Sequence, residues 1–479
     1  MRAQVVWVLQ VFDLGLLAYF IAINSLHLLF SIVAYLELRR HRRKRTSHEH
    51  GAVMRSPATP AISLIVRAHN LESTIHEKLK SFLDLNFPQF EVVVVNDGST
   101  DRTAHVAIKA FDLIRAPMDN PQPLGHRPVL EIYRSLINRD LVLVDKEHGG
   151  RADAINAGIN AARHPLVCVI DADSLLEDET LARAVLPFVE DPRTVAAGGM
   201  VRIANGCRAA HGRVVEVSLP KSRLAMFQVV ERLRASVTNV AESVFQVPTI
   251  PNAFGIFRRD LIIEAGGFRA GSADDDSEIV ARLHEVCRER GQPCRIVFQP
   301  DAICWTYAPE TVQALANLRR DRQLGTLQML VGGTGLMFNA RRGVAGLFAW
   351  SRSLIVGGVG PLVEFTAYVL TVAAVALGLL DWRFAEMLFL VAVIYGSIVS
   401  LAAVLLQELS PRPYPRVMDL LRLAAYSLLA NIGYRQLTMW WRVRGFVDFL
   451  SFTSRPPAGD GWNRPRPPAP AVLRARYPG

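Results

Sequence analysis

The sequence predicts an α/β domain with a mainly parallel sheet, flanked on both sides by membrane-spanning and interfacial helices. Three observations lead to this fold class. Between residues 61 and 308, apolar runs of strand length alternate with helix-length amphipathic segments, which is typical of right-handed βαβ crossovers. Apolar stretches long enough to cross a bilayer stand on either side of that region. Finally, 50% of the residues are hydrophobic and the mean hydropathy is +0.20, which is more apolar than an ordinary soluble enzyme.

The first of these stretches runs from Val5 to Leu36 and carries only one formal charge, on Asp13. It exceeds the ~20 residues that a helix needs to span a bilayer. Because it is too long for a signal-peptide core and ends in no small-residue cleavage site, we expect a retained anchor over residues 1–40. The basic run from Arg39 to Arg45 follows directly, which predicts a cytoplasmic C-terminal end for this span. Residues 41–60 are then a basic, proline-containing linker.

The region 61–308 is predicted to be one domain of alternating strands and helices. Its carboxyl-edge crevice is where open α/β sheets bind ligands. The predicted order is strand Ile62 to Val66, helix Glu72 to Leu85, strand Glu91 to Val95, strand Leu141 to Val144, helix Arg151 to Arg163 and central strand Leu166 to Ile170.

The central strand is followed by two carboxylates one residue apart, Asp171 and Asp173. Alternation along the strand is expected to turn both carboxylates to the same side. Two oxygen ligands on one side suit a hard divalent cation, Mg²⁺ or Mn²⁺, that holds a diphosphate. The structural alternative is a strand-end aspartate followed by a helix N-cap, because Ser174 and Glu177 have the spacing of a capping box.

Two further strand ends and helix starts carry polar residues suited to a ligand. Asp97 ends the second predicted strand. The Gly98 to Asp101 segment that follows has residue types typical of turns and helix caps. The Asp97 carboxylate could accept hydrogen bonds from the N–H of a uracil-like base, or it could simply form a tight turn. Arg151 follows two glycines at a helix start, which suits close approach to phosphate. The alternative there is a glycine loop with a solvated arginine.

Three adjacent carboxylates, Asp274, Asp275 and Asp276, precede the apolar positions of a predicted helix. Acidic residues at a helix N-terminus suit its dipole, which is the structural interpretation. Their mutual repulsion can also raise the pKa of one carboxyl group toward that of a useful general base. Both interpretations remain open from the residues alone.

Charge and cysteine content exclude some classes of protein. The net charge of +10 is concentrated in clusters beside the apolar spans, without the basic and aromatic interleaving of a nucleic-acid groove. We therefore expect contact with anionic lipid and no nucleic-acid partner. The five cysteines contain no C-x-x-C pair. This pattern predicts reduced structural thiols, with no disulfide and no zinc site.

The C-terminal third is predicted to return to the membrane. Residues 309–343 form an interfacial amphipathic segment, because Ala308 to Leu330 places arginines on one face. Within residues 344–450, two spans are expected at Gly357 to Leu380 and Phe384 to Leu406. The segment Asp419 to Val443 has an apolar core of only about 18 Å, so an interfacial or re-entrant helix is favoured over another span. The tail 451–479 is expected to be disordered.

Taken together, six motifs occur in the order seen in family 2 glycosyltransferases. The chain resembles the membrane-embedded synthases of that family, the group that holds hyaluronan, chitin and poly-N-acetylglucosamine synthases. The resemblance extends from about Ala61 to Gln328. The motifs are VVNDGSTD, GGRADAINAGI, DAD, FGIFRRD…AGGF, DDDSEI and PCRIVFQPDAICWT.

The resemblance implies a GT-A fold and an inverting, metal-dependent transfer of a sugar from a nucleotide-sugar, most simply a UDP-sugar. It further implies a multi-pass protein of the plasma membrane, with its catalytic domain in the cytoplasm and a polysaccharide or glycolipid acceptor. The implied site residues are Ala68, Asn70, Glu72, Asp97, Arg151 and Asp171 for the donor, Asp171 and Asp173 for Mg²⁺ or Mn²⁺, Asp276 as catalytic base, and Asn252 and Arg322 for the acceptor.

The sequence departs from the family pattern at three places. Arg67 to Leu71 stands where the family usually has Pro-Ala-Tyr-Asn-Glu, and Arg151 replaces a lysine. The acceptor motif Q-x-x-R-W reads Arg319 to Gln323 and lacks the tryptophan that lies under the acceptor sugar in the synthases. Two alternatives to polymer synthesis therefore stay open. One is transfer of a single sugar to a lipid acceptor, and the other is a catalytically weak membrane subunit that works with envelope-biosynthesis partner proteins.

Overall fold

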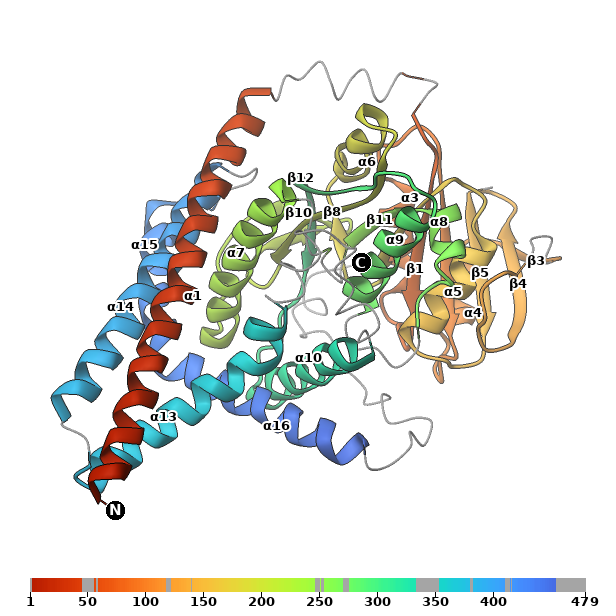
Figure 1. Ribbon diagram of the computed structural model, residues 1–479. Helices are drawn as coiled ribbons and strands as arrows, with labels where there is room; N and C mark the ends of the chain where they lie inside the picture. Colours follow the sequence, from red (N-terminus) through yellow and green to blue (C-terminus); the bar gives the residue numbers. More distant parts are fainter. Residues whose placement is uncertain are drawn as a thin grey trace.

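A ten-stranded sheet forms the centre of the α/β domain, and a group of long helices stands beside it (Figure 1). The strand order is β3-β4-β5-β2-β1-β6-β11-β8-β12-β7. This computed structural model describes residues 2–44, 56, 59–117, 122–138, 140–245, 250, 254–269, 275–332, 353–379, 382–409, 414 and 416–453.

Four neighbouring strands in the middle of the sheet are parallel: β5 (Leu141–Lys146), β2 (Phe90–Asp97), β1 (Ile62–Ala68) and β6 (Leu166–Asp171). They confirm the predicted mainly parallel α/β fold. Next to β6 lies β11 (Phe254–Arg258), which is antiparallel to both of its neighbours. The remaining strands of this sheet are β3 (Leu113–Ala116), β4 (Val129–Ser135), β7 (Leu175–Leu176), β8 (Thr194–Ile203) and β12 (Arg295–Thr306); a separate ribbon pairs β9 (Arg208–Ala210) with β10 (Arg213–Glu216).

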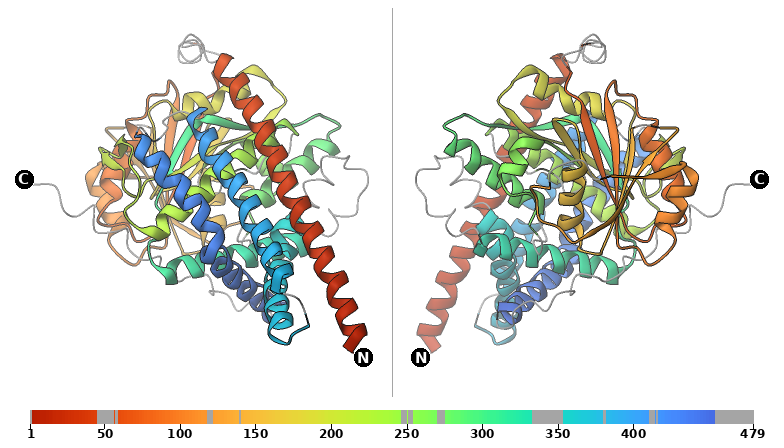
Figure 2. Two further views of the ribbon diagram at one scale, coloured as in Figure 1. Left: turned by 90° about the vertical axis from the view of Figure 1, so that its left-hand side faces the viewer. Right: turned by 90° about the vertical axis from the view of Figure 1, so that its right-hand side faces the viewer.

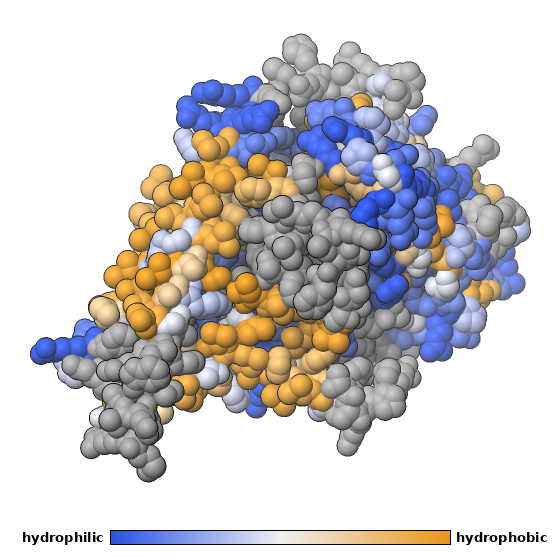
Figure 3. Space-filling view, in the orientation of Figure 1, coloured by the Kyte–Doolittle hydropathy of each residue, from blue (hydrophilic) through white to orange (hydrophobic). Residues whose placement is uncertain are grey.

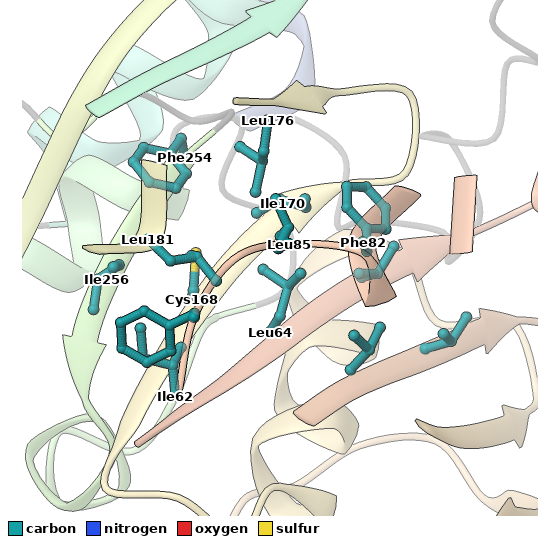
Figure 4. Close-up of a cluster of buried hydrophobic side chains, with 14 of the residues drawn as sticks. Ile62, Leu64, Phe82, Leu85, Cys168, Ile170, Leu176, Leu181, Phe254 and Ile256 are labelled. Carbon is teal, nitrogen blue, oxygen red and sulfur yellow. The ribbon is translucent and has the colours of Figure 1, made fainter. Parts of the chain in front are cut away.

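Helices cover both faces of the sheet, which is why its central strands read as continuous apolar runs such as Val92 to Val95. One hydrophobic core lies beneath α3 (Ile75–Leu83), α4 (Thr103–Ala110) and α6 (Thr180–Glu190). Figure 4 shows its centre, where Leu64 of β1, Ile170 of β6 and Phe82 of α3 converge. A second core lies on the opposite face, beneath α5 (Arg151–Ala161), α8 (Arg259–Glu264) and α9 (Asp275–Glu289).

Among the described residues, three helices are long and apolar enough to cross a membrane. Their candidate spans are Leu17–Arg43 in α1 (Arg2–Lys44), Gly357–Ala376 across η2 (Ser353–Val359) and α13 (Gly360–Ala376), and Phe389–Leu409 across α14 (Trp382–Leu406) and η3 (Gln407–Leu409). They flank the α/β domain as predicted. On the face shown in Figure 3, hydrophobic side chains gather over these helices, whereas the domain beside them is mainly hydrophilic.

Helix α7 (Arg223–Val244) lies between the long helices α1 and α14 and the sheet (Figure 1 and Figure 2). One buried cluster contains Phe30 and Ala34 of α1, Val240 of α7 and Ala403 of α14. The same cluster contains Phe298 of β12, so it reaches the edge of the sheet. The membrane helices and the α/β domain therefore share a hydrophobic core.

The segment predicted to be interfacial or re-entrant consists of two helices with a break between them. These are α15 (Val417–Leu429) and α16 (Arg435–Thr453), joined by η4 (Ala430–Tyr434). Inside η4, Ile432 has φ −117° and ψ 107°, and Gly433 has φ +86°, which only glycine adopts readily. Helix α10 (Val312–Gly332) packs against α16. The relation of these helices to the bilayer stays a prediction.

One expectation is wrong: Cys287 and Cys294 form a disulfide, with their Cα atoms 5.9 Å apart. Helix α9 ends at Glu289, and Gly291, at φ +65°, reverses the chain so that Cys294 returns beside the last turns of the helix. Six residues separate the two cysteines, a spacing that matches no redox or metal motif, so this pairing could not be predicted from the sequence. Cys168, Cys207 and Cys304 are not part of a disulfide. Most of the predicted linker and of the tail, residues 45–55 and 454–479, lies outside the described residues.

Candidate active site

The predicted donor residues lie at the carboxyl edge of the parallel strands. Strand β1 lies between β2 and β6, so Arg67 pairs with Val95 on one side and with Asp171 on the other. Ala68 is the last residue of β1, and Asp97 is the last residue of β2. The strand register therefore brings Ala68, Asp97 and Asp171 to one edge of the sheet, where open α/β sheets bind ligands.

The carboxylate of Asp97 is fully buried and surrounded by donors. Its Oδ1 accepts a hydrogen bond from the Gly149 N–H at 2.9 Å and lies 3.4 Å from Lys146 Nζ. Its Oδ2 lies 3.4 Å from Arg67 Nε. In this arrangement Asp97 holds the glycine loop against the strand end, and its contact with a nucleotide base stays a prediction.

Lys146 is a residue that the sequence reasoning did not single out. Its side chain has 0% exposure at the end of β5, and Nζ lies 2.5 Å from Asp153 Oδ1 in helix α5. The same ammonium donates to the Glu147 carbonyl oxygen. Lys146 thus joins two carboxylates, those of Asp97 and Asp153, from different elements. A lysine that follows the apolar run Leu141 to Val144 was the available signal.

The glycine loop before α5 approaches the strand ends closely. Gly150 has φ +87° and begins the helix, and a Cβ atom on Gly149 would lie 2.2 Å from Asp153 Oδ1. No side chain fits at Gly149 without displacing that carboxylate. Arg151 is the first residue of α5, and its Nε lies 3.7 Å from Asp171 Oδ1. The structure therefore brings together Arg151, at a helix N-terminus, and Asp171, at a strand end.

Asp173 is reached by a turn rather than by strand alternation. Strand β6 ends at Asp171, and the Ser174 N–H donates to the Asp171 carbonyl oxygen at 3.0 Å. The assumption that β6 continues through Asp173 is therefore wrong. Lys78 of α3 donates to the Asp173 carbonyl oxygen at 3.3 Å. Burial lowers the pKa of Lys78, and the Asp173 charge partly offsets this effect.

Asn70 and Glu72 organise the loop that follows β2. Asn70 has φ +52°, and its Oδ1 accepts from the Thr100 N–H at 2.8 Å. Glu72 accepts from Arg102 Nε at 2.8 Å, and this hydrogen bond is the main reason that the pKa of Glu72 is lowered. Both side chains are engaged within the protein, so a direct contact with the donor stays a prediction.

Three predicted residues remain: the catalytic base and the two acceptor residues. Asp276 lies in the first turn of α9, but its side chain is outside the described residues, and so is Asn252. Arg322 lies in α10. Next to it, Gln323 stands where the family has tryptophan, and its amide is buried. Its Nε2 donates to the Gly357 carbonyl oxygen at 3.0 Å, and its Oε1 accepts from Arg442 Nε at 2.8 Å.

The donor set at the strand edge fits a hard divalent cation that shares its coordination with a ligand. Within the described ranges, no group of three or more His, Cys, Asp and Glu side chains could enclose a metal ion. Asp171 and Asp173 would therefore supply one or two oxygens, and phosphate and water would supply the rest, as is usual for Mg²⁺. Asp171 is also the carboxylate beside Arg151, which would contact the same phosphate.

The fold and its strand-edge site define this domain as a GT-A domain. Among solved structures, a mannosyltransferase from Pyrobaculum calidifontis, in complex with GDP-Man and Mn²⁺, superposes with a TM-score of 0.52 at 20% identity. The match covers 88% of this chain and 99% of that structure, and it supports the fold.

Residues 63–263 match the family described as Glycosyl transferase family 2. Among curated relatives, the poly-β-1,6-N-acetyl-D-glucosamine synthase of Staphylococcus epidermidis is 25% identical over 257 residues, and that of Staphylococcus aureus strain COL is 26% identical. Each match covers 53% of this chain and 52% of the relative, so the chain spans about half the length of these proteins. Residues 63–263 are therefore similar to the family 2 glycosyltransferases.

Proposed function

We propose that this chain is a membrane-anchored, inverting glycosyltransferase that uses a cytoplasmic nucleotide-sugar, most simply a UDP-sugar, and a divalent metal. The observation that carries the proposal is the 3.7 Å contact of Arg151 with Asp171 at the carboxyl edge of the sheet. A helix N-terminus, a guanidinium group and a carboxylate meet there beside a glycine loop. This combination suits a nucleotide diphosphate with its cation.

In the proposed reaction, an acceptor hydroxyl attacks the anomeric carbon, and the bond from that carbon to the diphosphate breaks. Asp276 takes the proton of the hydroxyl. Arg151 neutralises part of the charge that develops on the diphosphate, and Asp171 and Asp173 would hold Mg²⁺ or Mn²⁺. When bound, that ion would act as a Lewis acid on the leaving diphosphate.

The orientation rests on the basic end of α1. Arg39 to Lys44 follow the apolar part of this helix, which favours a cytoplasmic C-terminal end and a cytoplasmic catalytic domain at the plasma membrane. The cytoplasm is also where we expect the nucleotide-sugar. Three candidate spans support a multi-pass protein.

Transfer of a single sugar is a second candidate for the mode of action. Gln323 occupies the position of the acceptor tryptophan, and its amide is already bonded to Gly357 and Arg442. It is therefore engaged within the protein and offers no flat ring on which a growing polymer could stack. A carbohydrate or lipid-linked acceptor that takes one sugar would need no such platform.

The test is nucleotide diphosphate release by the purified full-length chain, screened over nucleotide-sugars with and without Mn²⁺. We expect metal-dependent release with at least one donor. Asp173→Ala should lower the rate by about 10²-fold or more, because a Lewis acid supplies several kcal/mol of charge stabilisation. Asp84→Ala, at an exposed aspartate, is the matched control. Full activity of Asp173→Ala at saturating Mn²⁺ would refute the metal assignment.

The general base can be tested separately, because three neighbouring aspartates offer three candidates. Asp276→Asn keeps the shape of the side chain but cannot accept a proton, so turnover should fall by roughly 10²–10⁴-fold. Donor affinity should survive. The same substitution at Asp274 or Asp275 should have a smaller effect. If one of those two proves indispensable instead, the assignment of Asp276 is wrong.

A further inference from the structure

Helix α7 carries two arginines without an ion-pair or hydrogen-bond partner among the described residues. Arg232 and Arg234 are partly buried, and in the part of the chain that the structure describes neither guanidinium group makes an ion pair or a hydrogen bond. Burial lowers the pKa of both, that of Arg234 to about 10. A cation that is partly removed from water and has no partner loses part of its hydration, and a nearby anion would compensate for this loss.

The neighbouring carboxylates do not fill this need, because other cations hold them. Glu231 pairs with Arg319 and also accepts from the Tyr434 hydroxyl. Glu364 forms a bidentate pair with Arg435, with N–O distances of 2.8 Å. The surroundings of Arg234 therefore hold excess positive charge.

Arg234 also lines a cavity of about 150 Å³ between three helices. His27 of α1 and Thr238 of α7 share its wall with Arg234, and Val399 and Ala403 of α14 close it with apolar side chains. Both α1 and α14 are candidate membrane spans. The cavity holds the volume of roughly five water molecules. It is smaller than the ~300 Å³ or more of a typical pocket for a drug-sized ligand, so it suits a headgroup rather than a whole nucleotide-sugar.

We propose that this cavity binds the phosphate headgroup of a membrane lipid, with Arg234 as its main cationic contact. The inference goes beyond the proposed function, since it adds a ligand for the helices beside the α/β domain: a lipid monophosphate. A neutral sugar hydroxyl would not need a cation, whereas a phosphate satisfies both the charge and the hydrogen-bonding capacity of a guanidinium group.

The position of the cavity favours a lipid over free phosphate. Its apolar wall belongs to α14, and the same helix exposes Leu390, Ile394 and Ile398 along its length. An acyl or polyprenyl chain that leaves the cavity would therefore find apolar side chains at membrane depth. Free phosphate would gain nothing from this surface.

The first experiment measures binding without any donor. The full-length chain in detergent micelles is titrated with a polyprenyl monophosphate, with the polyprenol of the same chain length, and with inorganic phosphate. We expect the monophosphate to bind at least tenfold more tightly than either of the others. Equal affinity for the polyprenol, or inorganic phosphate binding as tightly as the lipid, would overturn the proposal.

The second experiment assigns the contact. Arg234→Gln removes a charge-assisted hydrogen bond worth about 1.5–3 kcal/mol, so affinity for the monophosphate should fall about 10- to 100-fold. Arg223→Gln, at an exposed arginine of the same helix, is the matched control and should bind like the unmodified chain. Arg234→Lys keeps the charge and should retain part of the affinity, which also covers the case in which the glutamine variant unfolds. Unchanged binding by a folded Arg234→Gln chain would refute the assignment.

Failure of this inference and failure of the proposed function give different results. Nucleotide diphosphate release is measured on the same preparations, first without lipid and then with the monophosphate. If the chain releases nucleotide diphosphate but does not bind the monophosphate preferentially, the lipid site is refuted and the glycosyltransferase proposal is not affected. If the chain binds the monophosphate tightly through Arg234 but releases no diphosphate from any donor, the lipid site is supported and the catalytic proposal is refuted.

Discussion

Replacement of Lys146 by methionine should destabilise the catalytic domain strongly. The Lys146 ammonium is fully buried, 3.4 Å from Asp97 Oδ1 and 2.5 Å from Asp153 Oδ1. Methionine has a similar length and keeps the packing of the stem, so the main effect is loss of the charge between two carboxylates. Asp97 would retain Arg67 and the Gly149 N–H, whereas Asp153 would retain only the Arg127 N–H, at 2.7 Å.

The magnitude follows from the burial of the pair. Removing one partner of a buried ion pair typically lowers the free energy of unfolding by about 3–5 kcal/mol, because the other charge is left uncompensated. For a domain of this size, 1 kcal/mol shifts the unfolding midpoint by roughly 2–4 °C, so we expect a decrease on the order of 10 °C. Lys146→Met combined with Asp153→Asn removes both charges and should recover a large part of the loss.

The assay is thermal unfolding of the full-length chain in micelles, followed by tryptophan fluorescence. Lys221→Met, at an exposed lysine, is the matched control and should leave the midpoint within about 1 °C, since most surface substitutions change stability little. If Lys146→Met unfolds at the same temperature as this control, the buried network does not stabilise the site. No recovery in the double variant would show that the loss came from packing rather than from charge.

Three further predictions concern other parts of the chain. Because burial lowers the pKa of Lys78, the unfolded chain binds more protons between that lowered pKa and 10.5, so stability should rise with pH across this window. Urea midpoints should show the rise in the unmodified chain, and a rise of the same size in Lys78→Met would contradict it. Cys294→Ser should lower the stability of oxidised protein by about 2 kcal/mol and leave reduced protein unchanged, and equal midpoints for oxidised protein with and without the substitution would contradict this. Finally, Lys109→Cys, exposed on α4, should react with an impermeant thiol reagent only after cells are opened, whereas labelling in intact cells would place the domain outside.

The central strands and their terminal residues were predictable because their signals are local. A buried parallel strand reads as an apolar run, so Leu166 to Ile170 and Glu91 to Val95 were recognised within two residues of β6 and β2. Asp97, Arg151 and Asp171 follow directly from such runs and from a glycine loop. Each of these features is encoded by residues that are neighbours in the sequence.

The remaining features depend on contacts between distant segments. Lys146 and Lys78 look like ordinary surface lysines in the sequence, and only the packing of α5 and α3 on the sheet buries them. Helix α7 mixes apolar and polar residues as an amphipathic helix does, so nothing local shows that Arg234 meets two candidate membrane spans. The turn that separates Asp173 from β6 was missed because the strand ends two residues before Asp173, so side-chain alternation along the strand no longer sets the direction of that side chain.

The core shared by α1, α7, α14 and the edge of the sheet bears on how the catalytic domain moves. One buried cluster contains Phe30, Val240, Phe298 and Ala403. The α/β domain therefore packs directly against α1 and α14 and does not depend on a linker alone for its position. Separating the two would expose apolar surface on both. In the proposed membrane arrangement, the strand edge with Asp171 would consequently stay at a fixed distance from the bilayer. An acceptor would have to extend over that distance. The length of its own lipid or sugar chain would then determine which acceptors can react.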